Sequence, residues 1–248
     1  MEHVKAENII VAIERILDYV KRIEIALNRL GLDKDHSILK NINNAKGLSE
    51  EIKKEVEHAN KDFHNIMREI ISIYDHFLRD IAHLVGTNSE IYRKLEINYN
   101  HLTFLSRLDL HNPNSIIKAT SSILHIEQII FHYARGNRRA HDIFLNYANI
   151  IKNRVSNKLE KYVIDRLAKI EKMIKELANI ANSIFKELAS LSKNVRYQAI
   201  YKEILVDEKK LREILEYLNE LSGEIKLLIT SLNRMEQALI QITYHLSV

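Results

Sequence analysis

Leucine and isoleucine recur at alternating gaps of three and four along most of this chain, and this spacing constrains its fold more than any other feature. Such spacing keeps apolar side chains on one face of an α-helix. The clearest example lies between residues 161 and 193, with Leu167, Ile170, Ile174, Leu177, Ala181, Ile184, Leu188 and Leu191. A helix from Lys161 to Lys193 would be about 50 Å long. It therefore needs partner helices along most of its length.

The same spacing predicts the partner helices. We expect helices over residues 4–30, 49–85, 89–109, 113–136, 195–205 and 211–246, with a short helix or loop over residues 33–46. A further apolar stripe over residues 143–151 is placed to continue directly into the long helix. In the last of these helices, the apolar residues that line one face, here called its seam, keep the same spacing on both sides of Gly223. One unbroken helix is therefore predicted there, although glycine within a helix costs about 1 kcal/mol relative to alanine.

The predicted helix ends rest on residues that suit caps. Gly31, Gly47 and Gly86 are expected to stop helices, because glycine adopts the left-handed conformation that commonly follows a helix. Ser49 is a predicted N-cap, and Thr87 to Glu90 matches the capping-box pattern. Asn112 followed by Pro113 is a normal helix start.

Composition supports an all-α fold, because five glycines and one proline in 248 residues leave few turns for a sheet. We predict an elongated multi-helix bundle with long, antiparallel, coiled-coil-like C-terminal helices. Apolar residues flank both C-terminal seams, which favours a three- or four-helix bundle within the chain or across a dimer. The predicted division is an N-terminal half over 1–110 and a C-terminal half over 111–248, unless the two form one continuous domain.

Cysteine is absent, which excludes disulfides, thiolate zinc sites and a cysteine nucleophile. The charged stretch from Met1 to Glu7 does not resemble a signal peptide, and no uncharged apolar run is long enough to span a membrane. We therefore expect a soluble protein, cytoplasmic or virion-associated, with no membrane span.

Positive charge gathers in the middle of the chain. Residues 111–160 hold seven Lys and Arg against three Asp and Glu, a net charge of +4 that equals the net charge of the whole chain. The centre of this excess is Arg135, Arg138 and Arg139, with His132 just before them and His141 just after. Such a cluster can contact phosphate groups, so these residues are the candidate nucleic-acid-binding set.

The stretch Arg135-Gly136-Asn137-Arg138-Arg139-Ala140-His141 resembles the Arg-X(4 to 6)-His motif of the HEPN family of helical-bundle ribonucleases. The resemblance covers seven residues, and Gly136 is an insertion relative to the common form of the motif. It implies a metal-independent endoribonuclease that forms its site by dimerisation, with Arg135 and His141 as the catalytic pair. An arginine can stabilise the phosphoryl transition state while a histidine moves a proton. The alternative is a solvated basic helix start.

Other patterns have simpler explanations. Arg79 to His83 is one residue too short for the same motif, and His76, Asp80 and His83 share a helix face that could hold zinc with a fourth ligand. That face lies opposite the apolar seam, so it is more simply the solvent side. Glu55 and His58 form a single Glu-x-x-His element, whereas a di-iron bundle needs two. No metal site or cofactor is predicted.

The leading interpretation is therefore a non-enzymatic interaction or scaffold protein that presents helix faces to a protein partner or to itself, as a homo-oligomer. The helices near 161–191 and 211–246 are its expected contact element. The first alternative is the HEPN-like ribonuclease or RNA-binding domain, and the second is a basic helical protein that coats nucleic acid.

Overall fold

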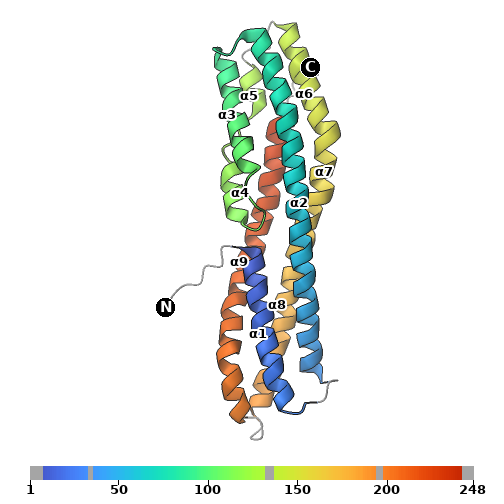
Figure 1. The fold of residues 1–248 in the computed structure, drawn as a ribbon, viewed down its shortest axis with the longest axis vertical. Helices are drawn as coiled ribbons and strands as arrows, with labels where there is room; N and C mark the ends of the chain where they lie inside the picture. The colour runs from blue at the N-terminus through green and yellow to red at the C-terminus, as the bar shows by residue number, and fades with distance from the viewer. Residues whose placement is uncertain (1–7, 33–35, 132–136, 194–197, 242–248) are drawn as a thin grey trace. The chain divides into compact units, whose positions relative to one another are not determined.

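The computed structural model describes residues 8–32, 36–131, 137–193 and 198–241 (Figure 1). All regular elements in these ranges are helical, which confirms the predicted all-α fold. They are α1 (Ile9–Arg29), α2 (Ser37–Val85), α3 (Glu90–Leu105), α4 (Pro113–Thr120), α5 (Ile126–Phe131), α6 (Arg138–Ile151), η1 (Lys152–Ser156), α7 (Asn157–Leu159), η2 (Glu160–Ile164), α8 (Asp165–Ser192) and α9 (Gln198–Ile240).

The chain divides into two compact units, each drawn from two stretches of sequence. The first comprises Met1–Glu57 and Ala168–Lys226, and the second His58–Leu167 and Leu227–Val248. Helices α2, α8 and α9 contribute residues to both units. The predicted division between residues 110 and 111 falls inside the second unit.

The first unit is a four-helix bundle formed by α1 and by parts of α2, α8 and α9. Polar contacts between neighbouring helices close a ring of four. They join Lys46 to Glu24 (2.8 Å, α2 to α1), Lys169 to Glu55 (2.9 Å, α8 to α2), Ser222 to Glu171 (2.8 Å, α9 to α8) and Arg22 to Asp207 (3.9 Å, α1 to α9). The flanking residues Met173, Phe185 and Leu215 are buried, so the wide apolar stripes of α8 and α9 pack within the chain.

Helix α2 continues through Gly47, where the sequence predicted a break. The reason is the apolar seam, which keeps its spacing through Ile42, Ala45 and Ile52, all at most 1% exposed. Ser49 occupies the intervening seam position and is fully buried, so it is not the predicted N-cap. Burying one isoleucine contributes about 1.5–3 kcal/mol, which exceeds the cost of about 1 kcal/mol for glycine within a helix.

The predicted helix over 113–136 is also wrong, because the chain turns between α4 and α5. Asn98 of α3 is fully buried and its side chain binds both backbone groups of Leu124, accepting from its N–H (2.7 Å) and donating to its carbonyl (2.9 Å). His101 donates through Nδ1 to the carbonyl of Ser122 (2.7 Å). These two side chains supply the hydrogen bonds that a helix would otherwise give to the carbonyl of Ser122 and to both backbone groups of Leu124.

Several predicted caps are confirmed. Asn112 accepts from the backbone N–H of Ser115 (3.3 Å), and Gly31 has φ +66° after α1. Helix α3 begins after Ser89, whose hydroxyl accepts from the N–H of Tyr92 (3.3 Å), so Thr87 is not its N-cap. Helix α9 is continuous across Gly223, as predicted, but the separate helices predicted over 195–205 and 211–246 are wrong: the buried side chains of Ile204, Glu208 and Leu211 keep the helical spacing, and one helix runs from Gln198 to Ile240. Ile242 and Leu246 lie outside the described residues.

The stripe over 143–151 does continue into the long helix, through two π-helical turns, η1 and η2. The buried side chains from Tyr147 to Leu167 are spaced by four residues five times: Tyr147, Ile151, Val155, Leu159, Val163 and Leu167. Each four-residue step overshoots a 3.6-residue turn by about 40°, so five steps drift by about 200°. Two turns that each take one extra residue cancel this drift, and the six side chains stay buried.

Replacing Gly47 or Gly223 with alanine should stabilise the fold. Both glycines lie within helices, and a Cβ atom added at either would meet nothing within 4 Å. We expect the free energy of unfolding in urea to rise by about 0.5–1 kcal/mol for each change. Gly31→Ala is the matched control: its space is equally open, but its positive φ should make the change destabilising by about 1 kcal/mol. A loss of stability in Gly223→Ala would contradict the unbroken α9.

Candidate functional site

The predicted ribonuclease motif lies at the start of α6 and is only partly described. Asn137 caps the helix by accepting from the backbone N–H of Ala140 (3.2 Å), and Arg138 and Arg139 are exposed in the first turn. His141 is 30% exposed, with Nδ1 3.7 Å from Oδ1 of Asp142. Arg135 and His132 lie outside the described residues, so the pairing of Arg135 with His141 stays a prediction.

The shorter motif and the possible zinc face lie on α2. His76, Asp80 and His83 are all exposed, which confirms that they occupy the solvent side of the helix. Nδ1 of His76 donates to the carbonyl of Ser72 (2.7 Å). Within the described parts of the chain, no group of three or more His, Cys, Asp or Glu side chains is arranged to hold a metal ion.

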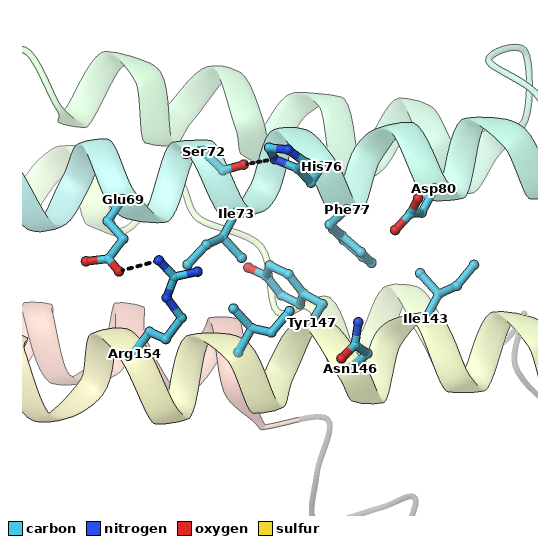
Figure 2. Close-up of a pocket in the computed structure, with 11 residues that line it drawn as sticks. Glu69, Ser72, Ile73, His76, Phe77, Asp80, Ile143, Asn146, Tyr147 and Arg154 are labelled. Carbon is cyan, nitrogen blue, oxygen red and sulfur yellow. Dashed lines mark hydrogen bonds and ion pairs between the residues drawn. The ribbon is translucent and has the colours of Figure 1, made fainter.

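Helices α2 and α6 enclose an open groove of about 360 Å³ in the second unit (Figure 2). Its floor includes Phe77 and Tyr147, which are stacked with ring centroids 4.3 Å apart. At one end the carboxylate of Glu69 pairs with Arg154 (3.3 Å) and with Lys158 (2.7 Å). The groove thus combines an aromatic floor with an ion-paired end, and polar side chains of His76, Asp80 and Asn146 also line it.

An aromatic cluster fixes α2 against α6 below this groove. Tyr74 meets Tyr147 edge-on (5.6 Å), and Phe77 meets Phe144 in the same way (5.1 Å). Burial raises the pKa of the Tyr147 phenol well above its ordinary value, and the hydroxyl of Tyr147 has no hydrogen-bond partner among the described residues. These rings pack as core, since edge-to-face pairs are a favourable aromatic geometry.

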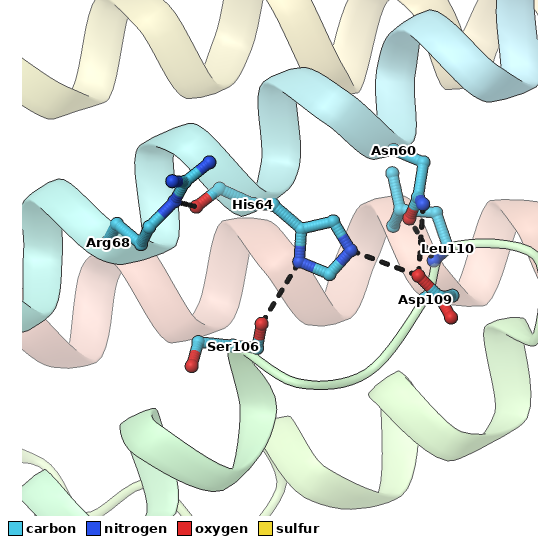
Figure 3. A network of polar contacts seen from close by, with 6 residues as sticks. All are labelled: Asn60, His64, Arg68, Ser106, Asp109 and Leu110. Atoms are coloured by element: carbon cyan, nitrogen blue, oxygen red, sulfur yellow. Dashed lines mark hydrogen bonds and ion pairs between the residues drawn. The ribbon is translucent and has the colours of Figure 1, made fainter.

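A polar network ties the end of α3 to α2 (Figure 3). Nδ1 of His64 lies 3.0 Å from the carbonyl of Ser106, and Nε2 lies 3.0 Å from Oδ1 of Asp109. Asn60 donates to the same carboxylate oxygen (3.0 Å) and accepts from the N–H of Leu110 (2.8 Å). Both ring nitrogens of His64 face acceptors, so both contacts are hydrogen bonds only when the imidazole carries two protons.

The most distinctive surface is on the first unit, where α1 and α9 lie side by side. Two large apolar residues are exposed on these helices, Ile25 of α1 (55%) and Val206 of α9 (59%). Arg22 pairs with Asp207 (3.9 Å) on one side of them, and Arg29 pairs with Glu203 (3.6 Å) on the other. We call these six residues the α1/α9 patch.

The α1/α9 patch has the layout of a contact surface. Each of its two helices contributes one exposed apolar side chain, with one charged side chain before it and one after it along the helix. In protein interfaces, a central apolar group surrounded by a polar rim is the usual arrangement, because the rim excludes water from the centre.

No family model, curated protein or solved structure matches this chain. Nor does any helix in the described ranges have the length and apolar character needed to cross a membrane.

Sequence reasoning missed the α1/α9 patch and the His64 network. Ile25 lies between the seam residues Ile23 and Leu27, so an apolar residue off the seam was the available signal for the patch. Nothing comparable marked the His64 network, because His64 and Asp109 are 45 residues apart and each looks like an ordinary surface residue.

The Asp109 network should make stability depend on pH. Hydrogen bonds from Asn60 and His64 hold the pKa of Asp109 below its ordinary value, so the carboxylate stabilises the fold above the unfolded pKa of about 3.9. This contribution is lost as the pH falls through the folded pKa. We expect Asp109→Ala to cost less than about 1 kcal/mol at neutral pH, since the side chain is 58% exposed.

Urea unfolding from neutral to acidic pH measures this effect. The stability gap between the parent and Asp109→Ala should shrink as the pH falls below 3.9, the ordinary aspartate value. Asn60→Ala, which also removes the bond to Leu110, should keep part of its gap at acidic pH. A gap for Asp109→Ala that widened on acidification would contradict the direction of the shift.

Proposed function

We propose that this chain is a non-enzymatic helical-bundle interaction or scaffold protein, and that the α1/α9 patch is its contact surface. The observation that carries the proposal is the exposure of Ile25 and Val206 on neighbouring helices that two ion pairs join, Arg22 with Asp207 and Arg29 with Glu203. Single exposed apolar residues are normal on soluble domains, but apolar residues grouped within a charged rim mark interaction sites.

The contact element differs from the pair of helices favoured by the sequence. Helix α9 belongs to it, but its neighbour on the patch is α1 rather than α8. The apolar residues flanking the seams of α8 and α9 include Met173, Phe185 and Leu215, which are buried in the first unit. They therefore leave little apolar surface for a partner, whereas the patch residues lie off the seams and stay exposed.

Site-specific photo-crosslinking tests this proposal. A photoreactive amino acid replacing Val206 should give a discrete adduct with one polypeptide in native cells, and Ile25→Ser should abolish that adduct. Leu227 is the matched control, because it lies on the same helix and is equally exposed, at 59%. Mass spectrometry then identifies the second polypeptide. The absence of an adduct at position 206, or equal adducts at both positions, would contradict the proposal.

A metal-independent ribonuclease of the HEPN type is the second candidate function. The observation that favours it is the exposure of Arg138 and Arg139 in the first turn of α6, where the positive end of the helix dipole also attracts phosphate. In this proposal Arg135 and His141 carry the chemistry, and Arg138, Arg139 and His132 bind the RNA backbone.

Cleavage of labelled single-stranded RNA in the presence of a metal chelator tests the ribonuclease. If it is correct, the parent should cleave and His141→Ala should lose about a hundredfold or more of the rate, as for removal of a general acid–base group. His83→Ala is the control, since His83 is an exposed histidine that ends the shorter motif. Equal cleavage by the parent and His141→Ala, or no cleavage by either, would remove this candidate. Binding without cleavage that weakens steeply with salt would instead indicate a nucleic-acid-coating protein.

A further inference from the structure

The charges of the α1/α9 patch are arranged by helix. On α1 the patch carries Arg22 and Arg29, and on α9 it carries Glu203 and Asp207. This separation is confined to the patch, since beyond it both helices expose charges of both signs, such as Glu14 and Lys21 on α1 and Lys209 and Glu216 on α9. Within the patch, the charged side chains of α1 are basic and those of α9 are acidic.

From this arrangement we infer that the partner of the α1/α9 patch is a second copy of this chain. The inference rests on the proposed function, because it names the occupant of that contact surface. A surface that is basic on one side and acidic on the other can be complementary to itself, which is what a twofold-symmetric interface requires.

The symmetry axis follows from the charges. A twofold axis that lies between the two copies and runs parallel to the helices places α1 of one copy over α9 of the other. Rotation about this axis keeps each residue at its own height, so Arg29 faces Glu203 of the second copy and Arg22 faces Asp207 of the second copy. An axis at right angles to the helices would place arginine over arginine, which is unfavourable.

The apolar residues lie where this axis passes. Ile25 of α1 and Val206 of α9 are flanked at both ends by the two ion pairs, so the rotation brings the apolar centres of the two copies together. Two exposed apolar side chains per copy form a small centre compared with the area of about 800 Å² per partner in standard interfaces. We therefore expect a weak dimer that forms at high protein concentration.

Charge reversal provides a test specific to self-association. The double variant Arg22→Glu with Arg29→Glu makes both sides of the patch acidic, and Glu203→Lys with Asp207→Lys makes both sides basic. Each variant alone should sediment as a monomer, with dimerisation weakened at least about tenfold by like charges across the interface. An equimolar mixture of the two should form a heterodimer, because acidic then meets basic on both sides.

The chain that carries all four substitutions is the matched control. Its charges are the reverse of the native ones, so α1 is acidic and α9 is basic. Opposite charges therefore meet again, both within the chain and between copies, and this variant should dimerise like the parent. Exposed ion pairs contribute only about 0–1 kcal/mol, so all of the variants should fold, and circular dichroism and thermal melting verify this. Ile25→Ser with Val206→Ser should give a folded monomer.

The outcomes separate the two proposals. A parent that dimerises, with the mixture restoring what each double variant loses, supports the second copy as partner. A parent that stays monomeric at all concentrations, or double variants that dimerise as the parent does, would overturn it. If the crosslinked polypeptide at position 206 is a different protein, the proposed contact surface stands and the inference about its occupant fails.

Discussion

Burial of an apolar seam along each long helix is the constraint on which the rest of this structure depends. The seam of α2 shows its strength, because it carries the helix through Gly47 and through the buried hydroxyl of Ser49, both of which disfavour a helix interior. Each buried isoleucine contributes about 1.5–3 kcal/mol, so one local helix-breaking residue cannot outweigh its neighbours on the seam. Charged contacts such as Lys46 with Glu24 then join neighbouring helices at the edges of the core.

The same constraint explains what the sequence could and could not predict. The fold class, the caps at Gly31 and Asn112 and the continuity of α9 across Gly223 followed from spacing and local chemistry, because neighbouring residues decide them. The turn between α4 and α5 could not be predicted in this way. It depends on Asn98, which is 26 residues from the backbone groups of Leu124 that it binds. Local propensity contains no information about such a contact.

The candidate sites also differ in whether the sequence could predict them. The exposed Arg138 and Arg139 are where the charge pattern predicted them, at the beginning of a helix. The α1/α9 patch was less visible, because the sequence shows single apolar residues off the seams and only the structure shows that α1 and α9, which carry Ile25 and Val206, are neighbours. The basic and acidic residues beside them are ordinary surface charges until the two helices are known to be neighbours. The spacing within one helix is thus enough to predict its buried residues, whereas a surface patch depends on which two helices are neighbours.

The two π-helical turns between α6 and α8 change the number of residues in the continuous helical segment that runs from α6 to α8. By taking up one extra residue each, η1 and η2 make the segment longer in sequence than the same segment built from uniform α-helix. A chain that formed the same helical segment without π-helical turns would therefore lack two residues, one near each turn. It would keep every buried position of the segment. Two one-residue deletions between positions 152 and 164 are therefore changes that this helix can accept without loss of its buried face.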